Sequence, residues 1–339
     1  MKLIIQIPCF NEAETLPIML SDLPRKLKGI SKIEWLIIND GSADETVKTA
    51  LAHGVDHVVS FKKNKGLAEG FLAGLDECLK QGADIIVNTD ADNQYNANDI
   101  ELLISPILDG KADIVIGARP ITNIKHFSIA KKILQKFGSW VVRKLSNTEI
   151  PDAPSGFRAI SRNAAMKLNV FNSYTYTLET IIQAGRKNMA IQSVPIRVNE
   201  DLRPSRLVKS IPSYIKKSMV TMFRIFVVYE PFRFFMTIGF IILLLGVAVG
   251  GRFLYFYFTV GGKGHIQSLI LCGALMGIGF QTILVAFLAD LLSVNRKLLE
   301  ELQYRMRRIE SNKAQKAGET KSKGQSKVKT KSKAKSKKK

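Results

Sequence analysis

Asp90 and Asp92, two aspartates one residue apart, are the residues whose type and spacing most directly suggest chemistry. The preceding residues 83–88 (ADIIVN) are mostly apolar and β-branched, which predicts a buried strand. Open α/β sheets bind their ligands beyond the carboxyl ends of such strands. Two carboxylates at this place, followed by Gln94, offer hard oxygen ligands. Such ligands suit a Mg²⁺ or Mn²⁺ ion that also binds the phosphates of a substrate. The alternative for an isolated D-x-D is a solvated acidic turn, so the surrounding sequence has to decide.

The chain around this motif alternates between apolar strand patterns and helical patterns, in units of about thirty residues. The expected strands lie at residues 3–7, 33–38, 56–61, 83–88, 113–116 and 191–198, with a further short strand after the loop at 152–158. Helical patterns lie at residues 11–27, 44–51, 67–79, 99–108, 126–145 and 176–184. The alternation predicts an α/β fold with a doubly wound, mostly parallel sheet.

Polar side chains that could bind a ligand follow the predicted strand ends. They are Glu12, Asp40, Lys65, Asp90, Asp92 and Arg119. Because the carboxyl ends of parallel strands meet at one edge of a sheet, we expect these residues to converge there.

The chain has 339 residues, with 50 Lys and Arg against 29 Asp and Glu, a formal charge of +21. About half of that excess lies in residues 311–339, a lysine-rich tail spaced by serine, threonine and glycine. Such a segment has little apolar surface to bury, which predicts disorder, and it could bind anionic lipid. Nothing else in the sequence supports a specific nucleic-acid partner. Cys9, Cys78 and Cys272 are widely separated, which predicts reduced thiols and no cysteine metal cage.

The last third of the chain has the composition of a membrane protein. Residues 212–229 interleave Lys and Arg with large apolar residues, a pattern typical of a helix lying in a membrane interface. An ordinary surface helix packed on the domain would show the same pattern. Two apolar runs, about 234–256 and 268–292, are each long enough to cross a bilayer. Basic residues flank both runs on the outside, so the positive-inside rule predicts a multi-pass protein of the cell membrane with the first domain and both termini in the cytoplasm.

These patterns divide the chain into five expected parts. They are a cytoplasmic catalytic domain (1–203), a juxtamembrane amphipathic helix (204–231), two transmembrane helices (232–294), a cytoplasmic basic helix (295–310) and a disordered tail (311–339).

Two common nucleotide-binding motifs are missing from the sequence. No G-x-G-x-x-G opens the first helix, which argues against a dinucleotide site, and no G-x-x-x-x-G-K-[ST] is present, which argues against a P-loop NTPase. The segments PCFNEAETLP, NDGSADET, NKGLAEG, TDADNQY, GAR and DAPSGFR, in that order, resemble the inverting family-2 glycosyltransferases with the GT-A fold. TYTLET, the RPSRL segment and the two apolar runs resemble the polyprenyl-phosphate group of that family, which includes dolichol-phosphate mannose synthase.

The resemblance implies a sugar transfer from a nucleotide-diphosphate sugar, a UDP- or GDP-sugar, to undecaprenyl or dolichyl phosphate. It implies that Asp90, Asp92 and Gln94 bind a Mg²⁺ or Mn²⁺ ion and that Asp90 also contacts the nucleotide-sugar donor. Positive charge along the donor phosphates would come from Lys65 and Arg119. The nucleoside would contact Pro8, Phe10, Glu12 and Asp40. This chain has Asn39 where the family commonly has aspartate.

The acceptor needs no proton removed, because a phosphate monoester has its second pKa near 6 and is largely a dianion at neutral pH. The enzyme instead needs cations that hold this anion in line with the anomeric carbon. Arg203 and Arg206 precede the interfacial helix, and an arginine fork can pair two phosphate oxygens. Electrostatic attachment to anionic lipid is the alternative role for both. The resemblance adds Asp152, Ser155 and Arg158 to the acceptor pocket.

Two other functions were weighed. A processive polysaccharide synthase with the same catalytic core would resemble its relatives in a Q-x-x-R-W motif and more spans, whereas Trp35 and Trp140 both lie outside that context. A membrane scaffold with a basic tail would have no use for the D-x-D site. Gly273, Gly277 and Gly279 form a small-residue pattern through which the spans could self-associate as a homo-oligomer.

Overall fold

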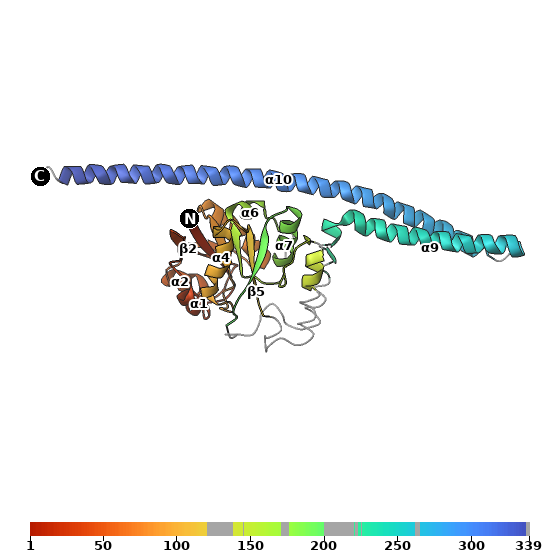
Figure 1. The fold of residues 1–339 in the computed structure, drawn as a ribbon, viewed down its shortest axis with the longest axis horizontal. Coiled ribbons are helices and arrows are strands. Elements are labelled where there is room, and N and C mark those ends of the chain that lie inside the picture. Colours follow the sequence, from red (N-terminus) through yellow and green to blue (C-terminus); the bar gives the residue numbers. More distant parts are fainter. Residues whose placement is uncertain are drawn as a thin grey trace. The chain divides into compact units, whose positions relative to one another are not determined.

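The computed structural model describes residues 1–120, 138–144, 146–170, 176–199, 220, 223–224, 226–261 and 265–336, with side chains to 310 and at 313. The chain divides into two compact units, Met1–Ile215 with Leu302–Lys339, and Lys216–Glu301. The first unit contains the α/β domain, and the second contains two long apolar helices (Figure 1).

A mixed sheet forms the centre of the first unit. Its strands are β1 (Lys2–Cys9), β2 (Lys32–Asn39), β3 (His57–Ser60), β4 (Ile85–Asn88), β5 (Ile114–Ala118), β6 (Arg158–Ser161) and β7 (Ile191–Pro195). The order across the seven strands is β3-β2-β1-β4-β6-β5-β7. All pairs are parallel except those that β6 makes with β4 and β5, so the expectation of a mostly parallel sheet is confirmed.

Helices cover both faces of this sheet. They are α1 (Leu16–Asp22), α2 (Thr46–Ala52), α3 (Leu67–Lys80), the 3₁₀ turn η1 (Ala97–Asp99), α4 (Ile100–Leu108), α6 (Arg162–Lys167) and α7 (Thr177–Arg186). Helices α1, α2 and α4 share one buried apolar core with alternate residues of the strands. Helix α3 packs on the other face against β1, β2 and α6, and its Phe71 stacks on Tyr176 at the start of α7. Gly74 allows this approach, because a Cβ there would lie 2.5 Å from Gln6 Oε1.

The observed elements differ from those expected from the sequence in the start of one helix and the direction of one strand. Helix α1 begins at Leu16, not near Asn11, because Asn11 has φ +56° and so cannot belong to a right-handed helix. The sequence also gave no sign that β6 would run antiparallel between β4 and β5. A strand of only four residues is too short for its pairing direction to be read from periodicity. Most of the expected helix at 126–145 lies outside the described residues.

The edge of the sheet remote from the strand carboxyl ends is tied by a buried carboxylate. Glu34 accepts hydrogen bonds from Lys2 Nζ (2.7 Å), Lys32 Nζ (2.5 Å) and His57 Nε2 (2.7 Å), which joins β1, β2 and β3. Burial alone would raise the pKa of Glu34, but these three partners outweigh it and lower the pKa from 4.5 to about 2.

The second unit contains α9 (Pro231–Val260) and the first part of α10 (Ile266–Ser336). Apolar windows in α9 and α10 have mean hydropathies of 2.4 and 2.1, yet only 11 % and 17 % of those windows are buried. A soluble core helix would be mostly buried, so two exposed apolar helices of this length are suited to a transmembrane hairpin. Both expected spans lie within them.

Glycines bring α9 and α10 into close contact within this hairpin. A Cβ on Gly239 would lie 3.0 Å from the Gly279 carbonyl oxygen, and one on Gly279 would lie 2.8 Å from Leu243 N. Gly279 therefore packs inside the hairpin, whereas Gly273 and Gly277 face open space in this structure. Self-association of the spans stays a prediction.

Two of the expected segments differ from the structure or fall outside it. The expected juxtamembrane helix at 204–231 lies largely outside the described residues, apart from a few positions between 220 and 229. Helix α10 continues to Ser336, through the segment whose composition predicted disorder. Lysine has a high helix propensity, which permits a helical backbone without burial of an apolar face.

Candidate active site

The D-x-D motif lies on the loop that follows β4, at the carboxyl edge of the sheet, as the strand pattern predicted. Asp92 Oδ1 accepts a hydrogen bond from Gln94 N (3.2 Å), and Asn93 adopts the left-handed conformation with φ +56°. The side chain of Asn93 donates to Asp22 Oδ2 (3.0 Å) at the end of α1. The loop is therefore a tight turn whose side chains are fixed by local hydrogen bonds.

Asp90 packs directly against the loop that carries Gly156. A Cβ on residue 156 would lie 2.9 Å from Asp90 Oδ2 and 3.1 Å from Oδ1, so only glycine leaves room for this carboxylate. Burial, and then the neighbouring Asp92, raise the pKa of Asp90 to about 7, against the opposing charges of Arg119 and Arg158. Two carboxylates that repel one another at a sheet edge are suited to sharing a divalent cation.

The oxygen atoms of Asp90, Asp92 and Gln94 suit a hard metal ion only if a bound substrate supplies the remaining metal ligands. Among the residues that the structure describes, no group of three or more His, Cys, Asp or Glu side chains gathers at one point. Asp90, Asp92 and the Gln94 amide supply oxygen atoms but few of the six that Mg²⁺ takes, so the remaining ligands would be phosphate oxygens and water. This is the way in which Mg²⁺ is commonly held between carboxylates and a substrate phosphate.

A buried hydrogen-bond network lies beneath the two aspartates, and the sequence did not predict it. Asn88, the last residue of β4, donates to Gly156 O (2.9 Å) and Tyr176 Oη (2.8 Å) and accepts from Gln6 Nε2 (2.9 Å). Tyr95 Oη accepts from Gly156 N (3.0 Å). These contacts hold the D-x-D loop against the loop at 152–157 and so fix where Asp90 lies.

Arg119 and Asp152 form a buried pair at the same edge. Arg119 donates from Nε (2.7 Å) and Nη2 (3.0 Å) to the two oxygens of Asp152, and its backbone N–H donates to Oδ2 (3.2 Å). A bidentate pair of this kind fixes both side chains. Arg119 is close enough to Asp90 to lower its pKa, but Asp152 neutralises much of its charge.

Arg158 holds the loop at 152–157 from beneath and does not line its surface. The side chain is fully buried and donates to Thr180 Oγ1 (2.6 Å), the Thr177 carbonyl (3.2 Å) and the Ser155 carbonyl. Arg158 and Asp152 are thus both buried and bonded to protein groups, and their expected role at the acceptor stays a prediction. Ser155 Oγ is also buried, but it has no hydrogen-bond partner among the described residues.

The expected donor side is built from the loops after β1 and β2. Both Asp40 oxygens accept backbone hydrogen bonds, from Lys65 N (2.7 Å) and Gly66 N (2.9 Å), so Asp40 fixes the turn before α3. Glu12 is buried and accepts from Thr15 Oγ1 (2.7 Å). Lys65 is exposed, with its ammonium 4.6 Å from the centre of the Phe61 ring.

The remaining residues expected at the donor side lie at the carboxyl end of β1, and Asn39 ends β2. Phe10 is 40 % exposed and Pro8 is partly buried, which leaves an apolar surface that a nucleoside could contact. Asn39 accepts from Ser42 N (3.0 Å) and donates to Ser60 Oγ (3.4 Å). An aspartate at this position could keep the second contact only by accepting from the Ser60 hydroxyl, because a carboxylate has no proton to donate.

The chain that leaves β7 is fastened to the D-x-D loop. Arg197 donates from Nε (2.9 Å) and Nη2 (2.6 Å) to Asp99. Asn199 donates from its side chain to Asn93 O and from its backbone to Gln94 O, both at 2.9 Å, and Val198 forms a β-bridge with Tyr95. Residue 199 is therefore beside the two aspartates. Arg203 and Arg206 lie outside the described residues.

Comparisons with known proteins agree with this geometry. Residues 4–168 match the family model described as Glycosyl transferase family 2. A UDP-N-acetylglucosamine–dolichyl-phosphate N-acetylglucosaminyltransferase of Methanococcus voltae is 29 % identical over 213 residues, 56 % of this chain and 83 % of that protein. An undecaprenyl-phosphate mannosyltransferase of Micrococcus luteus is 26 % identical over 218 residues, 61 % of this chain and 88 % of that protein.

The fold also matches solved structures. Glucosyl-3-phosphoglycerate synthase from Mycobacterium tuberculosis, crystallised with Mn²⁺, UDP-glucose and phosphoglyceric acid, superposes with a TM-score of 0.52. The match covers 65 % of this chain and 79 % of the synthase at 18 % sequence identity, so it shows the fold alone. Residues 4–168 are therefore similar to glycosyl transferase family 2, and the fold of this part of the chain is similar to that of the synthase.

Proposed function

We propose that this chain is a family 2 glycosyltransferase that moves a sugar from a UDP- or GDP-sugar to the phosphate of a membrane polyprenol, with inversion and at the cytoplasmic face. The relatives named above act on dolichyl and undecaprenyl phosphates. The observation that carries the proposal is the attachment of Val198 and Asn199 to the D-x-D loop. Asn199, which precedes the segment that contains Arg203 and Arg206, is hydrogen-bonded to Asn93 and Gln94 of the loop that carries Asp90 and Asp92.

Chain geometry supports a role for both arginines at the acceptor. In the sequence, Arg203 and Arg206 follow Asn199 by four and seven residues. This short separation supports a role in which their guanidinium groups would bind an anion beside the D-x-D loop. Both residues also precede the chain that enters α9, the first apolar helix.

The proposed reaction is a single in-line displacement. An oxygen of the lipid phosphate forms a bond to the anomeric carbon, the bond from that carbon to the β-phosphate oxygen breaks, and the nucleoside diphosphate leaves with the electron pair. No residue has to act as a base, because the acceptor phosphate is already ionised at neutral pH. One displacement inverts the configuration at the anomeric carbon.

The residues of the chain position the reactants. Asp90, Asp92 and Gln94 would hold Mg²⁺ or Mn²⁺, which when bound would offset the charge that develops on the leaving diphosphate. Asn88, Tyr95 and Gly156 keep Asp90 in place for that task. Lys65 would add positive charge on the donor side.

A radiochemical assay tests the proposal. Membranes containing the protein are incubated with polyprenyl phosphate and a panel of labelled UDP- and GDP-sugars, and the lipid fraction is counted. We expect label in the lipid with one donor, loss of transfer with a chelator, and recovery with Mn²⁺ or Mg²⁺. Asp92→Ala should abolish transfer without loss of folding, whereas the matched change Asp109→Ala, at an exposed surface pair, should have no effect. Normal transfer by Asp92→Ala would refute the metal assignment.

A further inference from the structure

The part of α10 that follows the apolar hairpin returns to the catalytic unit. The chain leaves that unit after Ile215 and rejoins it at Leu302, and α10 is a continuous helix across this second boundary. Residues 302–310 therefore belong both to the helix that contains the second candidate span and to the compact unit that contains the sheet. Nothing in the reaction proposed above uses this segment.

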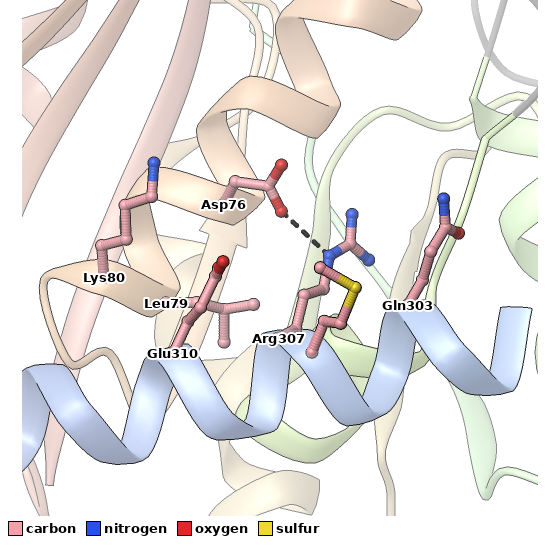
Figure 2. Close-up of a pocket in the computed structure, with 7 residues that line it drawn as sticks. Asp76, Leu79, Lys80, Gln303, Arg307 and Glu310 are labelled. Atoms are coloured by element: carbon pink, nitrogen blue, oxygen red, sulfur yellow. Dashed lines mark ion pairs between the residues drawn. The ribbon is translucent and has the colours of Figure 1, made fainter.

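Arg307 makes hydrogen bonds and an ion pair between this segment and the domain, and Lys167 Nζ also lies 5.7 Å from the centre of the Tyr304 ring. Arg307 Nε lies 3.1 Å from Asp76 Oδ1 on α3, and Arg307 Nη1 donates to Leu168 O (2.5 Å) and Asn169 Oδ1 (3.2 Å) after α6. Figure 2 shows Arg307 extending from α10 toward Asp76, with the ion pair drawn as a dashed line. A single side chain thus joins α10, α3 and the turn after α6.

This contact is more specific than a surface ion pair. The Asp76 side chain is 42 % exposed, and an exposed pair alone would contribute little. Leu168 and Asn169, in contrast, are 0 % and 4 % exposed, so removal of the guanidinium would leave buried acceptors without this partner. The side chain of Arg307 is itself only 18 % exposed.

The packing around Arg307 is open. A cavity of about 290 Å³ separates α3 from α10 and is lined by Leu79 and Lys80 on one side and by Gln303, Met306 and Glu310 on the other (Figure 2). Continuous apolar packing does not fill this interface. The position of residues 302–310 on the domain therefore depends strongly on the hydrogen bonds of Arg307.

We propose that Arg307 anchors residues 302–310 of α10 to the catalytic domain as a second attachment between that domain and the membrane hairpin. The first attachment is the chain that follows Asn199. Two attachments restrict the rotation and distance of a domain relative to the bilayer far more than one does. The anchor would keep the site aligned with a phosphate whose polyprenyl chain is embedded in the membrane, an inference that rests on the proposed function.

Hydrogen exchange of the full-length protein tests the anchor without reference to activity. In Arg307→Ala we expect the amides of residues 302–310 to exchange about 10-fold faster or more, because the helix loses its attachment to the domain. Asp76→Asn removes only the ion pair and should give a smaller increase. Arg308→Ala, an exposed neighbour on the same helix, should leave exchange unchanged. Equal exchange in wild type and Arg307→Ala would overturn the anchor.

Activity with two acceptors tests what the anchor is for. Wild type, Arg307→Ala and Arg308→Ala are assayed with long-chain polyprenyl phosphate in proteoliposomes and with a short-chain prenyl phosphate in detergent solution. We expect Arg307→Ala to lose transfer several-fold with the embedded acceptor and to retain it with the short-chain one. Equal losses with both acceptors, or none, would overturn the positioning role. Absence of transfer by wild type with either acceptor would instead refute the proposed function, and the exchange result would still decide whether the helix is anchored.

Discussion

Gly156→Ala is the sharpest perturbation that the structure offers, because it alters the position of a metal ligand without altering the ligand. The added Cβ would lie 2.9 Å from Asp90 Oδ2, half an ångström short of the ordinary contact distance of 3.4 Å. It would also lie 3.1 Å from Tyr176 Oη, which is held by Asn88, so the side that can yield is the carboxylate. Active sites tolerate about 0.5 Å of displacement, and about 1 Å can cost 100-fold. We therefore expect kcat/KM to fall by about 10- to 100-fold.

The assay is transfer of labelled sugar to polyprenyl phosphate at a series of Mn²⁺ concentrations. A displaced Asp90 should raise the Mn²⁺ concentration needed for half-maximal activity, which a general loss of folding would not do. Overpacking costs about 1–3 kcal/mol, so the thermal midpoint should fall while the protein stays folded. Gly138→Ala is the matched control, because nothing lies within 4 Å of the added Cβ. Wild-type kcat/KM and metal dependence in Gly156→Ala would show that Asp90 does not act from the position described.

Three further outcomes are expected. Replacement of both Arg203 and Arg206 by Ala should raise KM for polyprenyl phosphate at least about 10-fold while KM for the donor changes little, since charge-assisted hydrogen bonds to phosphate are lost; an equal effect on both substrates would indicate a folding role. Truncation after Arg308 should leave transfer in detergent intact, because it keeps the site and removes only the lysine-rich end; loss of transfer would contradict this. Glu34→Gln should lower stability by about 1–2 kcal/mol at pH 7, an amount reduced for the solvent exposure of Lys32. Because the folded-state pKa of Glu34 is depressed, this difference should be constant above about pH 5 and shrink as the pH falls from 4.5 toward 2, as followed by thermal melting at each pH.

The sequence predicted those parts of the fold that depend on local patterns. Apolar β-branched runs such as IIVN mark buried strands wherever they occur, so the sheet and the place of the D-x-D motif at its edge followed directly. The sites after β1, β2 and β4 were predicted for the same reason, because each follows a strand end.

The parts that could not be predicted depend on pairs far apart in the chain. Asn88 and Tyr176 are 88 residues apart, and neither lies in a pattern that would suggest a hydrogen bond between them. Arg158 follows a turn-rich loop, where an arginine would ordinarily be exposed, yet it is fully buried and bonded to α7. Its proximity to Asp90 follows from the antiparallel entry of β6 beside β4, which no local pattern indicated.

The charges at the site suggest where the acceptor must find its counter-ions. Arg119 is engaged by both oxygens of Asp152, and Arg158 is directed to the carbonyls and hydroxyl of its own loop and α7. Both arginines lower the pKa of Asp90, but in this arrangement neither directs its guanidinium group toward a place where the acceptor phosphate could bind. A donor diphosphate and a dianionic acceptor would bring at least three negative charges to this edge, more than one divalent ion offsets. We therefore propose that the additional cations are Arg203 and Arg206, which follow Asn199 within seven residues in the sequence, because Asn199 is itself hydrogen-bonded to the D-x-D loop.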